Sequence, residues 1–164
     1  MTDIPARVES IHIAPAAGAA MVGLERVGAT AGIGLAGDRY AAGTGHWTGY
    51  GSFTDRDITL IEAEVIEDLA VTDGIRLEPG ETRRNVTTRG IRLNDLVGRR
   101  FRVGAVDCEG TRLCEPCQYL TDHLGKPVLR PLVHRAGLRA RILTDGEIAI
   151  GDEVRALDGD VAED

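Results

Sequence analysis

The chain has 164 residues and a formal net charge of −7; 43% of its residues are hydrophobic and only 4% are aromatic. This length suits one domain with its own core. The negative charge argues against general nucleic-acid binding, which needs a basic surface. No apolar run approaches the about 20 residues of a membrane span. Three cysteines do not make a disulfide framework, and the N-terminus lacks the apolar core of a signal peptide. We therefore expect a cytoplasmic protein with reduced thiols and with neither membrane nor nucleic-acid partners.

Short segments rich in β-branched residues recur along the chain. They predict strands at residues 8–13, 21–27, 57–61, 84–88, 101–106, 107–113, 138–143 and 147–157. The first two strands are expected to form a hairpin, and Asp145-Gly146 predicts a second hairpin turn. Phe101, Val103 and Ala105 alternate with other residues, which predicts one buried face of a strand.

Helical signals are few. Ala63, Ile66 and Leu69 have helical spacing within residues 62–70, and residues 117–124 can form one or two helical turns. The pattern predicts a mainly β fold, a barrel or a sandwich with a few short peripheral helices. Residues 1–157 are expected to form a single domain, and residues 158–164 an acidic, frayed tail.

A glycine-rich stretch at residues 43–51 predicts a long irregular loop that contains Trp47. Two interpretations remain open. The loop is either a lid over a functional site or a surface loop anchored by its tryptophan.

Arginine is concentrated in one segment, whereas the chain has a single lysine, Lys126. The eight arginines between residues 83 and 112 are Arg83, Arg84, Arg89, Arg92, Arg99, Arg100, Arg102 and Arg112. Guanidinium groups bind phosphate and carboxylate in a bidentate manner. The segment is therefore a candidate anion site, with a solvated strand surface as the alternative.

The segment Cys114-Glu115-Pro116-Cys117 follows Arg112 and places two thiols three residues apart. A structural zinc site would need a second pair of Cys or His ligands, and a thioredoxin-like redox pair would need a βαβ setting. Two buried cysteines that only pack are a third possibility. The remaining interpretations use a thiolate as nucleophile, sulfur carrier or soft metal ligand, which a nearby guanidinium favours.

An ordered set of motifs resembles the MOSC domain family, named for the C-terminal part of molybdenum-cofactor sulfurase. The motifs extend from about residue 8 to residue 154. They are Gly34-Leu35-Ala36-Gly37-Asp38-Arg39, Asp57-Ile58-Thr59-Leu60-Ile61, Pro79-Gly80 with Arg83-Arg84-Asn85-Val86, Gly90-Ile91, Gly98, Val103-Gly104, Cys114-Glu115-Pro116-Cys117, Arg135-Ala136-Gly137, and Gly146-Glu147-Ile148-Ala149-Ile150-Gly151-Asp152.

The resemblance implies a MOSC-like β-barrel that binds the molybdenum cofactor, a molybdopterin; pyridoxal phosphate is not expected. Cys117 matches the cysteine that ligates molybdenum or carries sulfur in relatives, and Cys114 is its companion. Arg83 and Asn85 match residues that contact the pterin, and Arg39 matches a basic residue near the cofactor phosphate.

Further assignments concern the flanks of these motifs. Arg112, beside the thiols, is a further candidate for cofactor binding. The alternative for Arg39 is a structural ion pair with Asp38. Asp152 is expected to fix a turn, and His134 is either a proton donor or a surface histidine.

Three hypotheses follow from the resemblance. The first is a molybdenum-dependent oxidoreductase that reduces N-hydroxylated or related small molecules with electrons from a partner protein. The second is a sulfur-transfer domain that carries a persulfide on Cys117, supplied by a cysteine desulfurase, with Cys114 as resolving thiol. The third is a small interaction domain with a degenerate site.

Overall fold

The computed structural model describes residues 4–43 and 57–161. Its strands are β1 (Arg7–Ile13), β2 (Val22–Leu24), β3 (Arg26–Thr30), β4 (Gly34–Leu35), β5 (Ile58–Glu62), β6 (Val86–Arg89), β7 (Arg99–Val103), β8 (Val106–Leu113), β9 (Leu138–Ile142), β10 (Gly146–Ala149) and β11 (Val154–Val161). The α-helices are α1 (Ala63–Thr72) and α2 (Gln118–Leu124), and the short 3₁₀ helices are η1 (Pro79–Thr82) and η2 (Leu93–Leu96).

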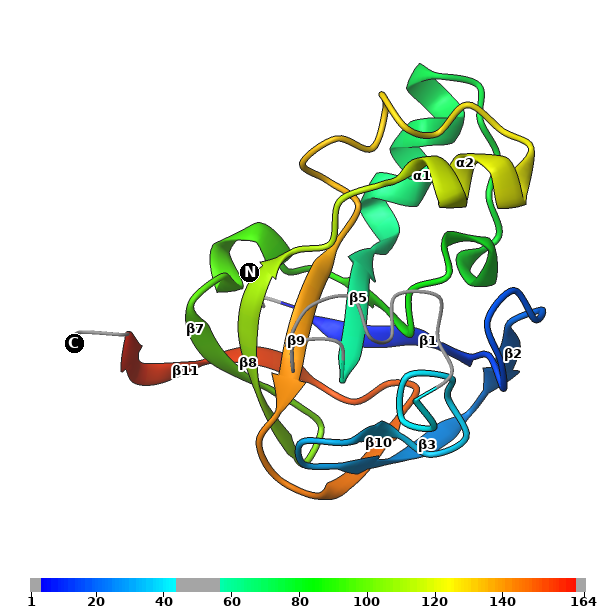
Figure 1. Ribbon diagram of the computed structural model, residues 1–164. Helices are drawn as coiled ribbons and strands as arrows, with labels where there is room; N and C mark the ends of the chain where they lie inside the picture. Colours follow the sequence, from blue (N-terminus) through cyan, green and yellow to red (C-terminus); the bar gives the residue numbers. More distant parts are fainter. Residues whose placement is uncertain (1–3, 44–56, 162–164) are drawn as a thin grey trace.

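The predicted mainly β fold is confirmed. Eight strands form one sheet in the order β11-β7-β8-β9-β5-β6-β1-β2, and a smaller sheet has the order β10-β3-β4. The large sheet curls into a half-barrel, and the smaller sheet lies at the end opposite α1 and α2 (Figure 1). Strands β5 and β6 pair in parallel, joined through α1 and η1, whereas the other pairs are antiparallel.

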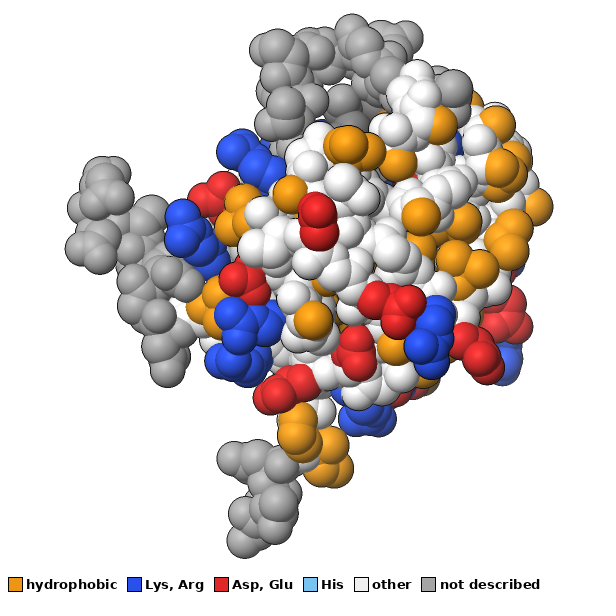
Figure 2. Space-filling view, turned by 90° about the horizontal axis from the view of Figure 1, so that it is seen from below, with side chains coloured by type: hydrophobic (Ala, Val, Ile, Leu, Met, Phe, Trp, Pro, Cys, Tyr) orange, Lys and Arg blue, Asp and Glu red, His pale blue; other side chains and the backbone are white. Residues whose placement is uncertain are grey.

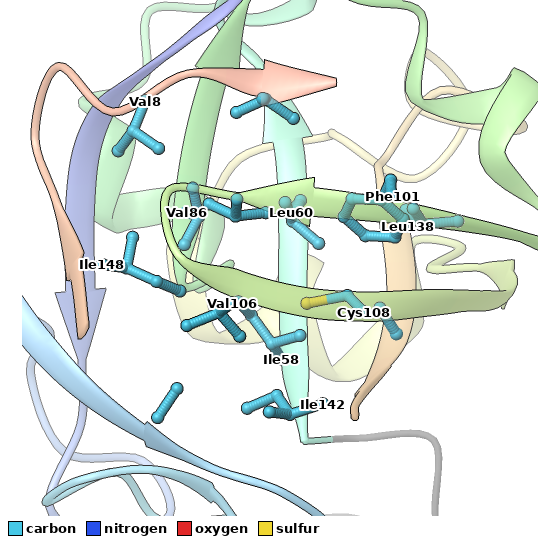
Figure 3. Packing of buried hydrophobic residues seen from close by; sticks show 14 of the residues in the cluster. Val8, Ile58, Leu60, Val86, Phe101, Val106, Cys108, Leu138, Ile142 and Ile148 are labelled. Carbon is cyan, nitrogen blue, oxygen red and sulfur yellow. The ribbon is translucent and has the colours of Figure 1, made fainter. Parts of the chain in front are cut away.

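Two hydrophobic clusters fill the molecule. The larger lies inside the half-barrel, where Ile58, Leu60, Phe101 and Leu138 are fully buried and point toward one another (Figure 3). The smaller lies under the helices and contains Ile61 of β5 with residues of α1, α2 and the chain after α2. Because successive strand residues point to opposite faces, β5 belongs to both clusters.

Several local predictions are confirmed. Strands β1 and β2 form the expected hairpin, and the buried face of α1 carries Ala63, Ile66 and Leu69 as predicted. The predicted second strand divides into β2 and β3, which belong to different sheets.

One predicted strand extends too far, and one predicted hairpin turn is wrong. Ala105 does not continue the buried face of Phe101 and Val103, because the chain reverses at Gly104-Ala105 and Val103 pairs with Val106. Asp145-Gly146 does not close a hairpin, because β10 pairs with β3 rather than with β9. The Asp145 carboxylate instead accepts a hydrogen bond from the Ala31 amide, 2.8 Å away.

Acidic and basic side chains are interspersed over the face seen in Figure 2, at the end that carries β3 and β10.

Strand β11 continues to Val161, into the segment for which the sequence predicts a frayed tail. Residues 162–164 and most of the predicted loop at 43–51, with Trp47, lie outside the described residues.

Among the described glycines, Gly110 and Gly137 have no room for a side chain because neighbouring backbone lies against them, and Gly137 also bears on the site. Gly137 has φ +115°, and a Cβ there would lie 2.0 Å from the Leu60 carbonyl oxygen of β5. The Gly137 carbonyl also accepts a 2.8 Å hydrogen bond from the Cys114 amide. Because Gly137 has no side chain, it can lie against β5. The cysteine segment, which is hydrogen-bonded to Gly137, therefore lies close to the sheet.

The Gly137→Ala variant is expected to lose more than about 3 kcal/mol of unfolding free energy. Two costs add: alanine is strained at a positive φ, and the backbone must also shift to make room for its Cβ. Gly74→Ala is the matched control: Gly74 also has positive φ, +67°, but its Cβ would meet nothing within 4 Å, so the loss is about 1–2 kcal/mol. Urea unfolding measures both values. Equal losses would show that the close approach to Leu60 is unimportant.

Candidate active site

Both cysteines of the Cys114–Cys117 segment line one cavity of about 80 Å³. The cavity lies where β5, β9, the turn after η1 and the start of α2 meet. Its lining residues are Arg39, Tyr40, Thr59, Arg83, Arg84, Cys114, Glu115, Cys117, Tyr119, Leu120 and Arg139. Four guanidinium groups, those of Arg39, Arg83, Arg84 and Arg139, therefore share the cavity with two thiols.

A second, larger cavity of about 550 Å³ adjoins the first through Arg83. It lies between η1 and α2 and is lined by His12, Ala20, Met21, Gly23, Glu78, Pro79, Gly80, Glu81, Arg83, His123 and Leu124. The small cavity contains the thiols, while the larger has the volume of an ordinary ligand site. We call them the thiol cavity and the histidine cavity.

Arg84 fixes the cysteine segment. Its side chain donates to the carbonyls of Cys114 (3.0 Å), Glu115 (3.4 Å), Ala136 (2.9 Å) and Thr82 (3.3 Å). A planar guanidinium with five N–H donors can satisfy several carbonyls at once. Arg84 thus ties the thiol-bearing chain to the turn before β6 and to the chain before β9.

Arg83 is buried, with 5% of its surface exposed, and adopts a left-handed conformation with φ 60° after η1. Its Nη1 donates to the Ala19 carbonyl at 2.8 Å and lies 3.4 Å from Nε2 of His123. Its Nη2 is buried without a hydrogen-bond partner among the described residues. Burial, followed by the charge of Arg39, lowers the pKa of Arg83.

Arg39 forms the ion pair with Asp38 that was the alternative interpretation of this residue. Its Nη1 lies 3.1 Å from Oδ1 of Asp38, which is itself buried and accepts the Ala14 amide. The guanidinium also donates to the Arg83 carbonyl at 3.2 Å and lies 4.8 Å from the centre of the Tyr40 ring. Arg39 therefore combines an ion pair with a place in the wall of the thiol cavity.

The arginines in the wall of the thiol cavity carry more positive charge than neighbouring carboxylates neutralise. Among the described residues, Arg83 and Arg84 hydrogen-bond only neutral groups, whereas Arg39 has the carboxylate of Asp38. A buried charge without an ionic partner is costly unless a ligand completes it. This arrangement can bind an anion.

Asn85 and Arg112, unlike Arg83, do not line either cavity. The Asn85 amide oxygen accepts from the amide and hydroxyl of Thr59, and its nitrogen donates to the His12 carbonyl at 3.1 Å. Asn85 therefore joins β5 to β1.

The remaining predicted arginines separate along the fold. Arg89 pairs with Glu9 and Glu67, and Arg102 pairs with Asp107. Strand alternation and chain reversal distribute the cluster over different faces, so Arg83 and Arg84 are its members at the cavities.

The cysteines differ in exposure. Cys117, which precedes α2, is half-buried, Cys114 is 6% exposed, and Cys108 is fully buried in the larger hydrophobic cluster. Burial raises the pKa of Cys108 to about 12. Across the described residues no three His, Cys, Asp or Glu side chains gather around a common metal position.

His134 lies beside the cysteine segment rather than in either cavity. Its Nδ1 lies 2.7 Å from Glu115 Oε2, and its amide donates to Glu115 Oε1. Burial alone would raise the pKa of Glu115, but these hydrogen bonds and the charges of His134 and Arg84 outweigh burial and lower it. Asp152 accepts the Ala149 amide at 2.9 Å and fixes a turn, as predicted.

The MOSC domain family model matches residues 18–155 of the chain. The chain belongs to the MOSC domain family. No curated protein matches its sequence.

Solved structures share the fold of this MOSC domain. YuaD from Bacillus subtilis has a TM-score of 0.77 at 20% identity, over 93% of this chain and 96% of that chain. YiiM from Geobacillus stearothermophilus has a TM-score of 0.73 at 16% identity, over 96% and 78%. YiiM from Escherichia coli has a TM-score of 0.65 at 16% identity, over 93% and 70%. In the described part of the chain, no helix is long and apolar enough to span a membrane.

Three residues of this MOSC site were not singled out from the sequence. Arg84 stands in the arginine cluster and in the motif Arg83-Arg84-Asn85-Val86 without a role of its own, His123 enters only as a histidine that forms no second zinc half-site, and Tyr119 carries no signal in the sequence. The i, i+4 spacing of Tyr119 and His123 on α2 places them on one face, with ring centroids 5.9 Å apart. Their position opposite Arg83 depends on tertiary structure.

The exposures of the three cysteines predict an order of alkylation. At about pH 8, iodoacetamide should modify Cys117 first and Cys114 more slowly, because thiolate character and access both control reactivity. Cys108 should remain unmodified until the protein unfolds, because burial excludes the reagent and keeps the thiol protonated. Peptide mass spectrometry over time checks the order, and early labelling of Cys108 would contradict it.

Proposed function

We propose that this MOSC domain binds a molybdenum cofactor across the thiol and histidine cavities and acts as an oxidoreductase. The observation that carries the proposal is Arg83, which lines both cavities and whose buried Nη2 lacks a partner among the described residues. A phosphorylated cofactor supplies the anion that such a group needs.

The donor set fits this cofactor. Cys117 offers a thiolate to a sulfur-loving metal, and its partial exposure leaves access for a ligand. Arg39, Arg83 and Arg84 would face the anionic parts of the cofactor. Because the described residues offer no metal cluster of their own, the other metal ligands would come from the cofactor.

When bound, the cofactor supplies two-electron redox chemistry. Reduction of an N-hydroxylated compound consumes two electrons and two protons and releases water. The electrons would come from a partner protein, and the protons from solvent. The residues of the chain would contribute binding. Cys117 would give up its thiol proton on ligating the metal, and the guanidinium groups would stabilise negative charge in a site of low dielectric constant. Reduced thiols suit a cytoplasmic location.

The test is purification from a host that makes the molybdenum cofactor. The wild-type protein is expected to carry molybdenum and pterin in equal amounts. Cys117→Ser should lose molybdenum, and Arg83→Gln should lose both. The control is Arg130→Gln, because Arg130 is exposed and lines neither cavity. Metal analysis and pterin fluorescence measure the content, and reduction of an aromatic amidoxime by reduced viologen measures activity. A folded wild-type protein with neither component would refute the proposal.

A persulfide carrier is the second candidate, favoured by the presence of two thiols in one cavity. In that function, Cys117 attacks the persulfide of a cysteine desulfurase and takes its outer sulfur, which then passes to an acceptor. Attack by Cys114 on the inner sulfur of the Cys117 persulfide would release hydrosulfide and leave a disulfide.

Incubation with a cysteine desulfurase and cysteine is therefore expected to add the mass of one sulfur atom to Cys117. Cys114→Ala should accumulate more of the adduct, because the resolving thiol is gone, whereas Cys108→Ala should behave as wild type. Non-reducing peptide mass spectrometry reads the result. Absence of the adduct in both wild type and Cys114→Ala would exclude this function.

A further inference from the structure

The histidine cavity places an imidazole against a buried guanidinium. His123 lies near the end of α2, and its Nε2 is 3.4 Å from Nη1 of Arg83. A guanidinium can only donate hydrogen bonds. For this contact to be a hydrogen bond, Nε2 of His123 must supply the lone pair, which is the arrangement of a neutral imidazole protonated on Nδ1.

The surroundings favour the neutral form of His123, although the residue is exposed to solvent. Burial, and then the charges of Arg83 and Arg39, lower its pKa. The Tyr119 ring lies beside it on the same helix. The other titratable groups of the cavity are His12 on β1, whose pKa burial also lowers, and Glu78 and Glu81 at η1.

The carboxylates of η1 have partners of their own. Glu81 accepts the Glu78 amide at 2.8 Å and lies 3.4 Å from Lys126 Nζ. The charged group in contact with His123 is the Arg83 guanidinium, whose Nη2 is still unpartnered within the described residues. A negative ligand arriving at Arg83 would reverse the local charge that His123 experiences.

We propose that the histidine cavity binds a divalent oxyanion of the phosphate-monoester class and that His123 takes up a proton when it does. Arg83 Nη2 donates to the oxyanion. His123 accepts one proton from solvent on Nε2, gives up its acceptor contact with Arg83 Nη1, and becomes a second donor. The inference rests on the anion-binding part of the proposed function and requires no molybdenum.

Linkage gives the sign of the pH dependence. A bound anion raises the pKa of His123 above its value in the free protein, so anion binding and protonation strengthen each other. Affinity is highest below the free-state pKa and falls as pH rises through the bound-state pKa. A pKa difference of one unit corresponds to a tenfold change in affinity.

Sulfate is the first probe, because its charge does not change between about pH 5 and about pH 8, where histidine titrates. The cofactor-free protein is expected to bind sulfate roughly tenfold more tightly at about pH 6 than at about pH 8. Calorimetry in two buffers of different ionisation enthalpy should show proton uptake. Two-dimensional ¹⁵N NMR should show Nδ1-protonated His123 in the free protein and a doubly protonated ring with sulfate.

His123→Gln is the informative variant, because glutamine can accept from Arg83 but does not titrate. It should still bind sulfate, without proton uptake and without the pH dependence. His134→Gln is the matched control, since His134 lies outside both cavities, and it should keep both. No sulfate binding, a doubly protonated His123 in the free protein, or proton uptake assigned to His12 would overturn the proposal.

Inorganic phosphate then distinguishes the sources of the anion. If protein loaded with molybdopterin no longer binds phosphate in the histidine cavity, the cofactor's own phosphate occupies this subsite. If loaded protein still binds phosphate with proton uptake, the subsite serves a phosphorylated substrate. Should the protein take up no cofactor while sulfate binding and proton uptake persist, the proposed function fails and this subsite stands.

Discussion

The hydrogen bonds of the Arg84 guanidinium are the constraint on which the site depends. One buried side chain reaches the carbonyls of Thr82, Cys114, Glu115 and Ala136, which come from three separate parts of the chain. Each buried carbonyl needs a donor, and the segments that contain them are too irregular to supply one through strand pairing. The position of the cysteine segment is therefore set by a side chain of the neighbouring turn.

The same arrangement explains why positive charge gathers at the thiols. Arg84 donates its hydrogen bonds to backbone carbonyls, and Arg39 forms an ion pair with Asp38. Both guanidinium groups are therefore held in place whether or not a ligand is bound. Arg83 differs, because one of its nitrogens is buried without a partner within the described residues. The wall of the two cavities thus contains fixed charges and two buried atoms without a partner among the described residues, Nη2 of Arg83 and Nδ1 of His12. A ligand gains most where polar groups of the protein still lack a hydrogen-bond partner.

The sequence predicted those features that depend on local periodicity. The buried face of α1 at Ala63, Ile66 and Leu69 and the β1–β2 hairpin follow from spacing alone. The failures concern relations between distant segments. Asp145 looks like a hairpin residue, yet its carboxylate bonds to Ala31 and β10 pairs with β3.

The candidate site shows the same division between local and distant information. Cys117 and Arg83 were identified through motifs, because their neighbours in sequence mark them. His123 carries no such mark, since its partner Arg83 is forty residues away. The bonding of Asn85 to Thr59 and His12 likewise depends on the register of β5, β6 and β1. Side chains that act between elements are visible only once the elements are assembled.

The participation of β5 in both hydrophobic clusters has a consequence for cooperativity. Ile58 and Leu60 belong to the half-barrel, and Ile61 to the cluster under the helices. Because the helical cluster contains fewer buried side chains, we expect it to open locally at a lower free energy than the half-barrel unfolds. The two cavities lie along that boundary. We therefore expect local opening of the helical cluster to control access to the thiols. Strand β5, which belongs to both clusters, stays paired in the half-barrel and allows the helical cluster to re-form on it.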